Sequence, residues 1–352
     1  MKRFQHVTDL GDLRTALAEA FEIKQNRYKY QELGRNKTAM LIFFNNSLRT
    51  RLSTQKAAQN LGMNVIVLDV NQGAWKLETE RGVIMDSDKS EHLLEAIPVM
   101  GSYCDLIGVR SFARFENRQD DYEEKIMQQF IRYSGRPVFF MESATVHPLQ
   151  AFADLITIKE YKNCTHVEPN PLFGGEAVAR TPNKRPKVVL SWAPHPKALP
   201  QAVPNSFAEW MLAAANLQTG IEGGMDFVIT HPKGYELDPQ FVGGAHVEYD
   251  QMRAFDGADF IYAKNWSCPG VTQPENYGKI LGDYHDYLDW TVGTRQMAVT
   301  NNAFFMHCLP VRRNMIVTDD VIEAPTSIVI PEAANREISA TVVLKRMLEA
   351  LS

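Results

Sequence analysis

The sequence has few cysteines, no long hydrophobic run and no large excess of charge of either sign. Its four cysteines are far apart and lack the spacing of metal ligands, so no metal site is expected. We expect a cytoplasmic protein whose thiols are reduced. The first residues lack the apolar core of a signal peptide, and no run could span a bilayer. With 37 basic and 42 acidic residues the net charge is -5. Neither a nucleic acid nor a membrane surface is therefore expected as a partner.

Glycine-rich nucleotide motifs are missing as well. The chain contains neither G-x-x-x-x-G-K-[ST] nor a G-x-G-x-x-G that follows an apolar strand. This argues against an ATPase and against a standard dinucleotide oxidoreductase, and no cofactor is expected.

Short apolar, β-branched runs alternate with longer amphipathic ones along the 352 residues. Continuous apolar strands separated by helices are typical of parallel sheets covered on both faces. The runs are too many for one small sheet, so the sequence predicts an α/β fold with two doubly wound parallel-sheet domains. Strands are expected near 38–44, 64–70, 105–110, 137–141, 187–192, 226–231, 258–263, 303–307 and 327–331. Helices are expected near 48–61, 89–103, 119–133, 149–162, 205–216 and 334–350.

The expected domains are separated by an irregular stretch. The first spans residues 1–155, with a C-terminal helix at 334–352 packing back on it, and the second spans 186–330. Residues 163–185 are rich in Pro, Gly, Asn and Thr and are expected to form a surface insertion.

The most informative motif is Ser47-Leu48-Arg49-Thr50-Arg51, which follows an apolar run ending at Phe44. Ser47 is a favourable N-cap for a helix. Two arginines in a first helical turn are unfavourable beside the positive end of the helix dipole. A bound anion would reverse that balance, because backbone N–H groups, hydroxyls and guanidinium groups would converge on it. The motif predicts a phosphate site, and the alternative is a capped helix with solvated arginines.

Three further segments follow expected strands, where open α/β sheets bind ligands. They are Arg110 in Gly-Val-Arg-Ser-Phe, the segment His147-Pro148-Leu149-Gln150, and the segment His307-Cys308-Leu309-Pro310. Alone, each has an ordinary explanation: a surface ion pair, a helix start, or a buried small thiol.

In this order the motifs resemble those of the transcarbamylase family. Its phosphate signature S-x-R-T-R is matched by Ser47 to Arg51, its H-P-x-Q by His147 to Gln150, and its H-C-L-P by His307 to Pro310. The resemblance covers essentially the whole chain. It implies two α/β domains, transfer of the carbamoyl group of carbamoyl phosphate to an amine, and a homotrimer whose sites are shared between subunits.

The resemblance also implies residue roles. The first domain would bind carbamoyl phosphate, with Ser47, the Leu48 backbone, Arg49 and Thr50 around the phosphate. Arg110, His147 and Gln150 would orient the carbamoyl group, with Arg336 nearby and the Cys308 and Leu309 carbonyls holding its NH₂. Arg110, His147, Arg49 and Thr50 are thereby the expected catalytic residues. Preorganised donors would stabilise the charge that grows on the carbonyl oxygen.

The second domain departs from ordinary ornithine transcarbamylases, which carry an aspartate after its late strand. Here Lys264 stands at about that position. A cation suits a carboxylate and would repel a free α-ammonium, so we expect an acylated α-amine; otherwise the lysine faces solvent. The acylornithine branch also has a tryptophan that reaches a neighbouring subunit and binds carbamoyl phosphate there, and Trp75 matches it. Glu142 and His195 match its substrate-binding residues, and the prolines around His195 resemble its knotted loop.

The acyl group is inferred from three positions. Acetyl-specific relatives carry an acidic residue that matches Ser90, whereas succinyl relatives usually have proline; Ser90 is uncharged and leaves room. Arg312 could pair with the extra carboxylate of a succinyl group, and Ile316 replaces a lysine of the acetyl branch. The expected acceptor is N-succinyl-L-ornithine, giving N-succinyl-L-citrulline and phosphate in arginine biosynthesis. The alternatives are N-acetyl-L-ornithine, free ornithine, or a catalytically silent anion-binding protein on the same fold.

Overall fold

The computed structural model describes residues 1–70, 72, 75–218 and 220–351. The chain divides into two compact units. The first unit comprises residues 1–11, 15–149 and 336–352, and the second comprises 12–14 and 150–335. Each is described by itself.

The first unit is built on a parallel five-stranded sheet with the order β1-β7-β6-β2-β3. Its central strands are buried on both faces, which agrees with their apolar sequences. The strands are β1 (Arg3–Phe4), β2 (Thr38–Phe43), β3 (Asn64–Asp69), β6 (Leu106–Arg110) and β7 (Val138–Glu142).

The direction of strand addition reverses once in this sheet. The chain passes from β2 to its neighbour β3 and then returns to β6 on the other side of β2. In open α/β sheets such a reversal leaves a ligand-binding crevice at the carboxyl ends of the two strands. Here those ends carry Ser47–Arg51 and Arg110.

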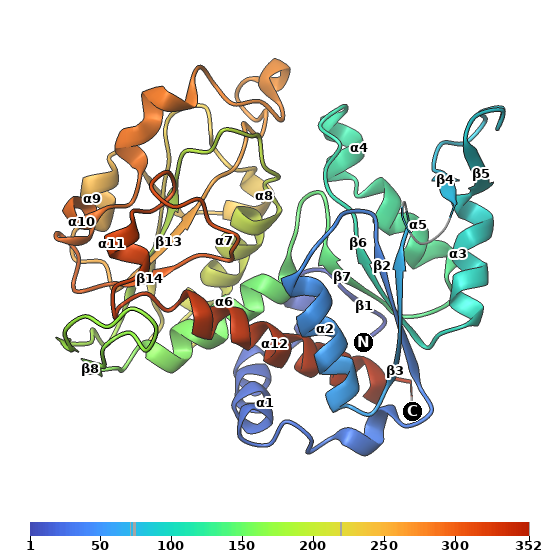
Figure 1. The fold of residues 1–352 in the computed structure, drawn as a ribbon, viewed down its shortest axis with the longest axis horizontal. Helices are drawn as coiled ribbons and strands as arrows, with labels where there is room; N and C mark the ends of the chain where they lie inside the picture. Colours follow the sequence, from blue (N-terminus) through green and yellow to red (C-terminus); the bar gives the residue numbers. More distant parts are fainter. Residues whose placement is uncertain (71, 73–74, 219, 352) are drawn as a thin grey trace. The chain divides into compact units, whose positions relative to one another are not determined.

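Helices cover both faces of this sheet (Figure 1). The helix α2 lies on one face and the pair α3 and α5 on the other. The bounds are η1 (Val7–Leu10), α1 (Leu13–Gln25), η2 (Gln31–Gly34), α2 (Arg49–Asn60), α3 (Leu93–Ser102), α4 (Arg118–Tyr122), α5 (Lys125–Tyr133) and α12 (Val329–Glu349). The helix α1 was not anticipated from the sequence.

The second unit repeats the same plan. Its parallel sheet has the order β12-β11-β10-β13-β14, so the reversal lies between β10 and β13. The strands are β10 (Lys187–Trp192), β11 (Asp226–Thr230), β12 (His246–Glu248), β13 (Phe260–Lys264) and β14 (Phe304–Met306). At the reversal, His195 follows β10 and Lys264 is the last residue of β13. The predicted fold class, two parallel-sheet α/β domains, is confirmed.

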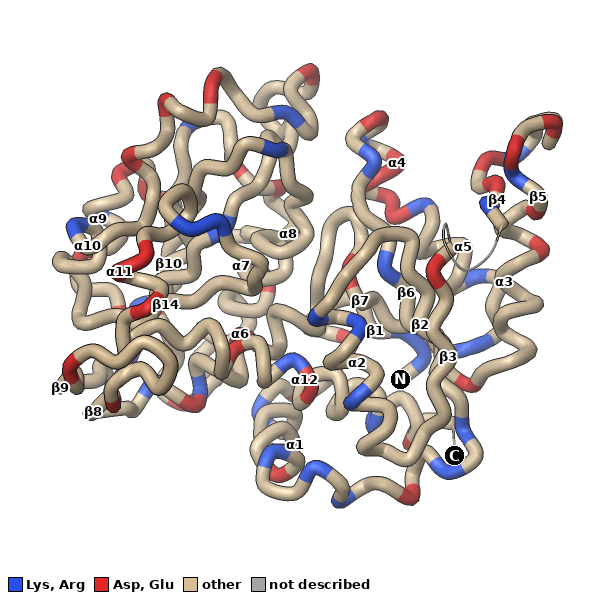
Figure 2. Tube along the Cα trace, in the orientation of Figure 1, with Lys and Arg blue, Asp and Glu red and all other residues tan. Residues whose placement is uncertain are grey.

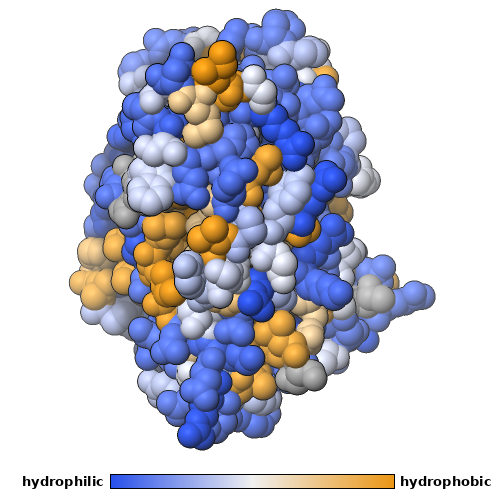
Figure 3. Space-filling view, turned by 90° about the vertical axis from the view of Figure 1, so that its right-hand side faces the viewer, coloured by the Kyte–Doolittle hydropathy of each residue, from blue (hydrophilic) through white to orange (hydrophobic). Residues whose placement is uncertain are grey.

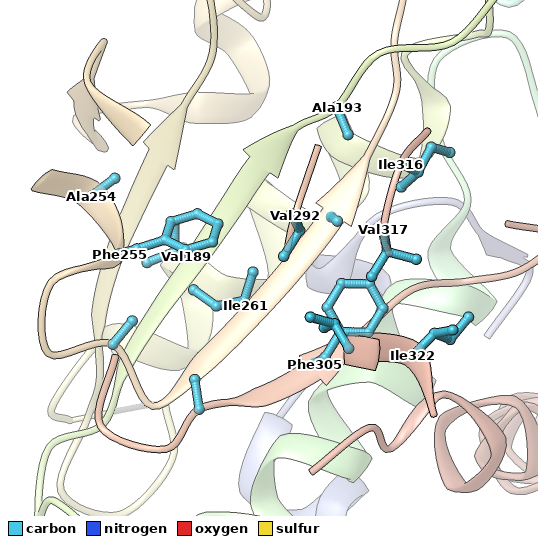
Figure 4. Packing of buried hydrophobic residues seen from close by; sticks show 14 of the residues in the cluster. Val189, Ala193, Ala254, Phe255, Ile261, Val292, Phe305, Ile316, Val317 and Ile322 are labelled. Carbon is cyan, nitrogen blue, oxygen red and sulfur yellow. The ribbon is translucent and has the colours of Figure 1, made fainter. Parts of the chain in front are cut away.

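One face of the second sheet packs on a cluster of buried apolar residues. Figure 4 shows Val189, Ile261 and Phe305, from three strands, facing Val292 and Val317 from the segments over that face. The helices of this unit are α6 (Pro148–Tyr161), α7 (Ala202–Ala215), α8 (Pro239–Val242), α9 (Gln251–Phe255), η3 (Pro274–Asn276), η4 (Tyr284–Trp290), α10 (Thr294–Met297) and α11 (Asp319–Ile322).

Three predicted elements are wrong in detail. The expected helix 119–133 is two helices, because Glu124 adopts a left-handed conformation with φ of 54°. The expected helix start at residue 89 is instead strand β5 (Lys89–His92), which pairs with β4 (Lys76–Glu78), and His92 caps the helix that follows. The expected strand 327–331 is the start of α12, whose first turn tolerates Pro331 because no N–H is needed there.

The insertion at 163–185 contains a small antiparallel ribbon of β8 (His166–Val167) and β9 (Val178–Ala179). Arg180 fastens it to the second sheet. Its Nε donates to the Asn302 carbonyl at 2.8 Å, its Nη2 lies 3.7 Å from Asp259 Oδ1, and its guanidinium stacks on Phe304. The insertion is thus anchored by a buried charge.

Charged positions of both signs are interspersed along the trace of each unit (Figure 2). The face in Figure 3 shows hydrophobic patches separated by hydrophilic residues. Within the described residues, no helix combines the length and the apolar character needed to cross a bilayer.

Candidate active site

The start of α2 forms the base of the candidate site in the first unit. The Ser47 hydroxyl accepts the Thr50 N–H at 3.3 Å, so the predicted capping bond is present although the helix begins at Arg49. The Leu48 side chain is exposed and Arg49 is partly buried. The first N–H groups of the helix therefore lie at the carboxyl end of β2, where an anion is favoured.

Two guanidinium groups converge on the Thr50 hydroxyl. Arg336 Nη2 donates to Thr50 Oγ1 at 2.7 Å, and Arg110 Nη1 donates to the same oxygen at 3.3 Å. All three side chains are buried, with Thr50 fully so. The structure thus brings together Thr50, Arg110 and Arg336, which are separated by up to 286 positions in the sequence.

Glu142 and His147 complete this cluster. The Glu142 carboxylate binds the Arg110 guanidinium, and His147 Nε2 lies 3.3 Å from Glu142 Oε2 and 3.5 Å from Arg336 Nη2. Glu142, which the resemblance matches to a substrate-binding residue, lies in contact with Arg110 and His147, two residues expected to bind carbamoyl phosphate. Its carboxylate holds Arg110 in place, because a bound guanidinium has less freedom to turn.

The loop between Glu142 and His147 is fixed by a buried acid. The Glu124 carboxylate accepts hydrogen bonds from the Ser143 hydroxyl, from the Thr145 hydroxyl at 2.5 Å and from the Thr145 N–H at 2.9 Å. Burial raises the pKa of Glu124, although these bonds oppose the shift. Glu124 thereby sets the loop that presents both Glu142 and His147.

The charges of this cluster favour an anionic ligand. Arg110 and Arg336 contribute two positive charges and Glu142 one negative charge, beside the positive end of α2. A hydrogen bond to a charged group contributes about 1.5–3 kcal/mol. A phosphate that accepted from Thr50 and both arginines would be firmly bound, and its neighbouring carbonyl oxygen could be polarised by the same donors.

Arg51 has a different role from its neighbours. Its guanidinium binds Asp69 at the end of β3 and stacks on the Phe43 ring, with 4.4 Å between the guanidinium carbon and the ring centroid. It braces α2 against the sheet.

The second unit carries the remaining motif residues on a buried network. Gln150 Nε2 donates to Asp154 Oδ1 at 2.7 Å and to Glu332 Oε1 at 3.3 Å. Glu332 Oε2 accepts the His307 N–H at 2.9 Å. Burial, reinforced by the charges of Asp154 and Cys308, raises the pKa of Glu332 well above its usual value. The network connects the H-P-x-Q segment with the H-C-L-P segment.

Three residues expected to bind the second substrate lie near one another in the second unit, and two of them, Lys264 and Arg312, are cations. Arg312 Nε donates to His195 Nε2 at 3.1 Å, and His195 Nδ1 donates to the Lys197 carbonyl at 2.9 Å. Lys264 is buried, at 8% exposure, and its Nζ donates to the Asn265 carbonyl at 2.9 Å, so it does not face bulk solvent. Burial lowers the pKa of His195, and the nearby charges of Lys264 and Arg312 act in the same direction.

Ser90 lies on β5, and Trp75 directly precedes its partner strand β4. Both are exposed, and Trp75 Nε1 donates to Glu91 at 2.7 Å. Gly73 and Ala74, which precede Trp75, lie outside the described residues. The structure of one chain thus places these two residues at the exposed ribbon of β4 and β5, and not with Thr50, Arg110 and Arg336.

Sequence reasoning missed Glu124, Asp154 and Glu332. Asp154 had a signal, because it lies four residues after Gln150 on an expected helix and so on the same face. Glu332 lies four residues before Arg336, but its segment was taken for a loop after a strand. Nothing in the sequence around Glu124 distinguishes it from an exposed helical acid.

Two family descriptions match the chain. The carbamoyl-P binding domain of aspartate/ornithine carbamoyltransferase matches residues 2–160, and the Asp/Orn binding domain matches residues 211–347. The chain belongs to the aspartate/ornithine carbamoyltransferase family. The carbamoyl-P binding match includes the Thr50 cluster apart from Arg336, and the Asp/Orn match includes Lys264 and Arg312.

Curated members of this carbamoyltransferase family align over the whole chain. N-succinylornithine carbamoyltransferase of Bacteroides fragilis (strain 638R) is 70% identical over 351 residues, which is 100% of both chains. N-acetylornithine carbamoyltransferase of Xanthomonas campestris pv. campestris is 36% identical and covers 96% of this chain and 94% of its own.

Solved carbamoyltransferase structures share the fold. Acetylornithine transcarbamylase complexed with acetylcitrulline has a TM-score of 0.79 at 33% identity, with 99% of each chain covered. An N-acetyl-L-ornithine transcarbamylase with one glutamate mutated to serine, complexed with carbamyl phosphate and N-succinyl-L-norvaline, has a TM-score of 0.81 at 34% identity. It covers 99% of this chain and 100% of its own.

Proposed function

We propose that this protein transfers the carbamoyl group of carbamoyl phosphate to the side-chain amine of N-succinyl-L-ornithine, giving N-succinyl-L-citrulline and phosphate in arginine biosynthesis. The observation that carries the proposal is the 70% identity, over the whole of both chains, to N-succinylornithine carbamoyltransferase of Bacteroides fragilis. The N-acetylornithine enzymes are only half as similar, at 36% identity or less for those of Xanthomonas and Xylella.

In this proposal first-unit residues bind the phosphate and the carbonyl oxygen of carbamoyl phosphate. The hydroxyls of Ser47 and Thr50, the Leu48 N–H and the Arg49 guanidinium hold the phosphate. Arg110, His147 and Arg336 polarise the carbonyl oxygen. The convergence of Arg110 and Arg336 on the Thr50 hydroxyl supports this arrangement. Gln150 and the carbonyls of Cys308 and Leu309 hold the carbamoyl NH₂.

The reaction needs no covalent intermediate. The side-chain amine of the acceptor attacks the carbonyl carbon, a C–N bond forms, and negative charge grows on the carbonyl oxygen. The C–O bond to phosphate then breaks, the carbonyl is restored, and the leaving phosphate takes the proton lost by the amine. Fixed donors such as Arg110 stabilise the growing charge without having to reorganise.

The acyl group is recognised by cations and by an uncharged position. Lys264 and Arg312 both carry a positive charge near His195. In this proposal these charges pair with the carboxylates of the succinylated amino acid. By resemblance, Ser90 replaces an acidic residue of acetyl-specific enzymes. That an N-acetyl enzyme with a glutamate mutated to serine is complexed with N-succinyl-L-norvaline agrees with this assignment.

The assembly in this proposal is a homotrimer in which the ribbon of one subunit completes the site of the next. The residues after Trp75 support a contact surface, because Val83, Ile84 and Met85 are 46%, 85% and 40% exposed. Consecutive exposed apolar side chains of this kind mark protein interfaces.

A substrate panel tests the function. Purified protein with carbamoyl phosphate is assayed with ornithine, N-acetyl-L-ornithine and N-succinyl-L-ornithine, and both the carbamoylated product and released phosphate are measured. We expect kcat/KM to be highest for the succinyl compound. A preference for the acetyl compound or for free ornithine would overturn the acceptor assignment, and no transfer to any acceptor would indicate a silent anion-binding protein.

A further inference from the structure

Glu124 differs from an ordinary helical acid in its backbone and in its burial. It separates α4 from α5 in a left-handed conformation, with φ of 54° and ψ of 43°. Glycine adopts this conformation freely, whereas a residue with a Cβ adopts it at a cost in free energy. Glu124 is also only 4% exposed, and burial disfavours the charged form of a carboxyl group. Residues with such costs gather at functional sites, where the surrounding contacts fix them.

The carboxylate of Glu124 is directed at one short turn. Its Oε1 accepts the hydroxyls of Ser143 and Thr145 and the Thr145 N–H, and its Oε2 accepts the Ala144 N–H at 3.4 Å. The Ser143 N–H donates to the Val146 carbonyl at 2.8 Å and closes the turn at residues 143–146. These partners of the carboxylate are donors, so an ionised acid suits them, and an amide in its place would set its NH₂ against one of them.

The turn connects two residues of the candidate site. Glu142 directly precedes it, and His147 directly follows it. His147 Nε2 lies 3.3 Å from Glu142 Oε2, and the Glu142 carboxylate also binds Arg110. Glu124 and these residues belong to the first unit. Because the turn sets the direction in which the chain reaches His147, a carboxylate that fixes the turn also limits the positions open to the imidazole ring.

We propose that Glu124 is a positioning residue for carbamoyl transfer, because its carboxylate holds the 143–146 turn and thereby places His147 against the carbonyl oxygen of carbamoyl phosphate. The inference rests on the proposed function, in which His147 helps to polarise that oxygen. The phosphate is assigned there to residues at the start of α2. Glu124 should therefore affect the chemical step more than it affects phosphate binding. A catalytic group misplaced by about 1 Å can lower a rate about 100-fold.

The test removes the carboxylate and keeps the backbone that carries it. In Glu124→Gly the left-handed conformation is free of strain, and in Glu124→Gln the amide NH₂ faces a donor. Carbamoyl transfer by the full-length protein is followed with saturating N-succinyl-L-ornithine, and binding of inorganic phosphate is measured by calorimetry. We expect kcat to fall about 10- to 100-fold in Glu124→Gly and less in Glu124→Gln. The affinity for inorganic phosphate should stay within about threefold, since a group that acts in the transition state changes kcat and not ground-state binding.

Formate provides a readout that general loss of structure would not give. A cavity of about 60 Å³ borders Glu124, Ala144 and Ser111, which is room for water molecules. Glu124→Gly adds the space of the lost side chain to this cavity, so formate should bind there as a carboxylate with the same donors. We expect sodium formate to raise the kcat of Glu124→Gly several-fold, whereas sodium chloride at the same ionic strength should not. Glu124→Gln should gain nothing, because its side chain still fills the space.

Asp105→Asn is the matched control. Asp105 lies at the amino end of β6, where its Oδ2 accepts the Thr38 N–H at 2.8 Å. It is thus a carboxylate that fixes the backbone of the same unit, at the end of the sheet opposite the candidate site. Asp105→Asn should lower the thermal midpoint, leave kcat unchanged and show no response to formate. Melting curves verify that each variant is folded, and if Glu124→Gly is not, Glu124→Gln decides.

The outcomes separate this inference from the proposed function. If the wild-type protein transfers carbamoyl groups and both Glu124 variants keep its kcat, the positioning role is wrong. Equal losses in kcat and in phosphate affinity would also overturn it, because that pattern indicates general damage. A failure of formate to raise the kcat of folded Glu124→Gly would do the same. If the wild-type protein transfers no carbamoyl group to any acceptor, the proposed function itself fails.

Discussion

At the scale of single residues, binding of the acceptor substrate is expected to depend on Lys264. This lysine is buried at the end of β13, beside the reversal of the second sheet. Replacing it by aspartate would put a negative charge where the proposed substrate brings a carboxylate. A like-charge contact of this kind costs several kcal/mol.

We therefore expect Lys264→Asp to lower kcat/KM for N-succinyl-L-ornithine at least about 100-fold, with little change in the affinity for carbamoyl phosphate. Lys264→Arg, which keeps the charge, is the matched control and should retain more activity. Steady-state kinetics with each substrate varied in turn measures both effects. Unchanged kinetics in Lys264→Asp would show that the lysine does not contact the acceptor.

His195 gives the second unit a predictable response to acid. Burial lowers its pKa from the usual 6.5, and the charges of Lys264 and Arg312 add to the shift. The neutral ring accepts the Arg312 Nε–H, and protonation would remove that acceptor. Because the pKa is lower in the folded state, the unfolded chain binds the proton first as the pH falls, so stability is present above about pH 6.5 and is lost below it.

We expect the thermal midpoint of the wild-type protein to fall between about pH 6.5 and 5 more steeply than that of His195→Gln, whose side chain does not titrate. Melting curves recorded at constant ionic strength over this range check the prediction. Parallel curves for the two proteins would mean that His195 is equally easy to protonate in the folded and unfolded chain.

At the scale of elements, the N-terminus of α2 is expected to supply the phosphate clamp. Arg49→Ala should reduce carbamoyl transfer about 10- to 100-fold, the effect of losing one charge-assisted hydrogen bond of about 1.5–3 kcal/mol. The comparison variant is Arg51→Ala, since Arg51 binds Asp69 and stacks on Phe43. Arg51→Ala should lower the free energy of unfolding and change the affinity for inorganic phosphate only slightly. Wild-type turnover in Arg49→Ala would remove this arginine from the clamp.

The strand β14 is expected to depend on one aromatic side chain. Phe305 is fully buried in the cluster of Figure 4, where it packs with Ile261 and Val317. Phe305→Ala should lower the free energy of unfolding by about 3–5 kcal/mol, because it leaves a cavity. Phe305→Leu should cost less. Denaturant unfolding measures both, and a loss under about 1 kcal/mol in the alanine variant would show that the cluster refills the space.

The sequence predicted the central strands well, because their buried apolar runs leave little choice of structure. Runs such as 187–192 match the observed strand in both bounds. The errors occur where a single side chain decides. Glu124 interrupts a helix to reach the Ser143–Thr145 backbone and hydroxyls, and periodicity contains no sign of that distant partner. Pro331 was taken for the end of a strand, although it suits a first helical turn equally well.

The site was predicted as separate motifs and not as a network. Thr50, Arg110, His147 and Arg336 are in contact as a cluster, as the resemblance implied. The acids that hold them, Glu124 and Glu142 among them, act through contacts with residues far along the chain or through backbone groups. Glu142 was named from the resemblance, but its contacts with Arg110 and His147, like those of Glu124 with the 143–145 loop, have no local pattern and are found only in the three-dimensional structure.

At the scale of the whole molecule, the proposed trimer predicts complementation between inactive variants. In that assembly Trp75 serves a neighbouring subunit, whereas Arg49 serves its own. Trp75→Ala and Arg49→Ala homotrimers should each have low activity. After unfolding and refolding together, some sites would combine an intact Arg49 with an intact Trp75.

We expect the mixed sample to recover activity well above the mean of the two separate variants. Each variant refolded alone is the control, and sedimentation velocity reports the assembly state. No recovery in mixed trimers would show that each subunit completes its own site, and a monomer in sedimentation would contradict the assembly altogether.

The two sheets reverse direction in the same way, with β2 and β6 in one unit matched by β10 and β13 in the other. By the general rule for open α/β sheets, each half of the chain is expected to bind a ligand at its own reversal, with its own set of loops. Mutations in the loops that follow β10 and β13 can therefore change which amine is accepted, while the first-unit residues proposed to bind carbamoyl phosphate stay unchanged. Evolution could diversify a lineage of enzymes on this plan by editing one half at a time.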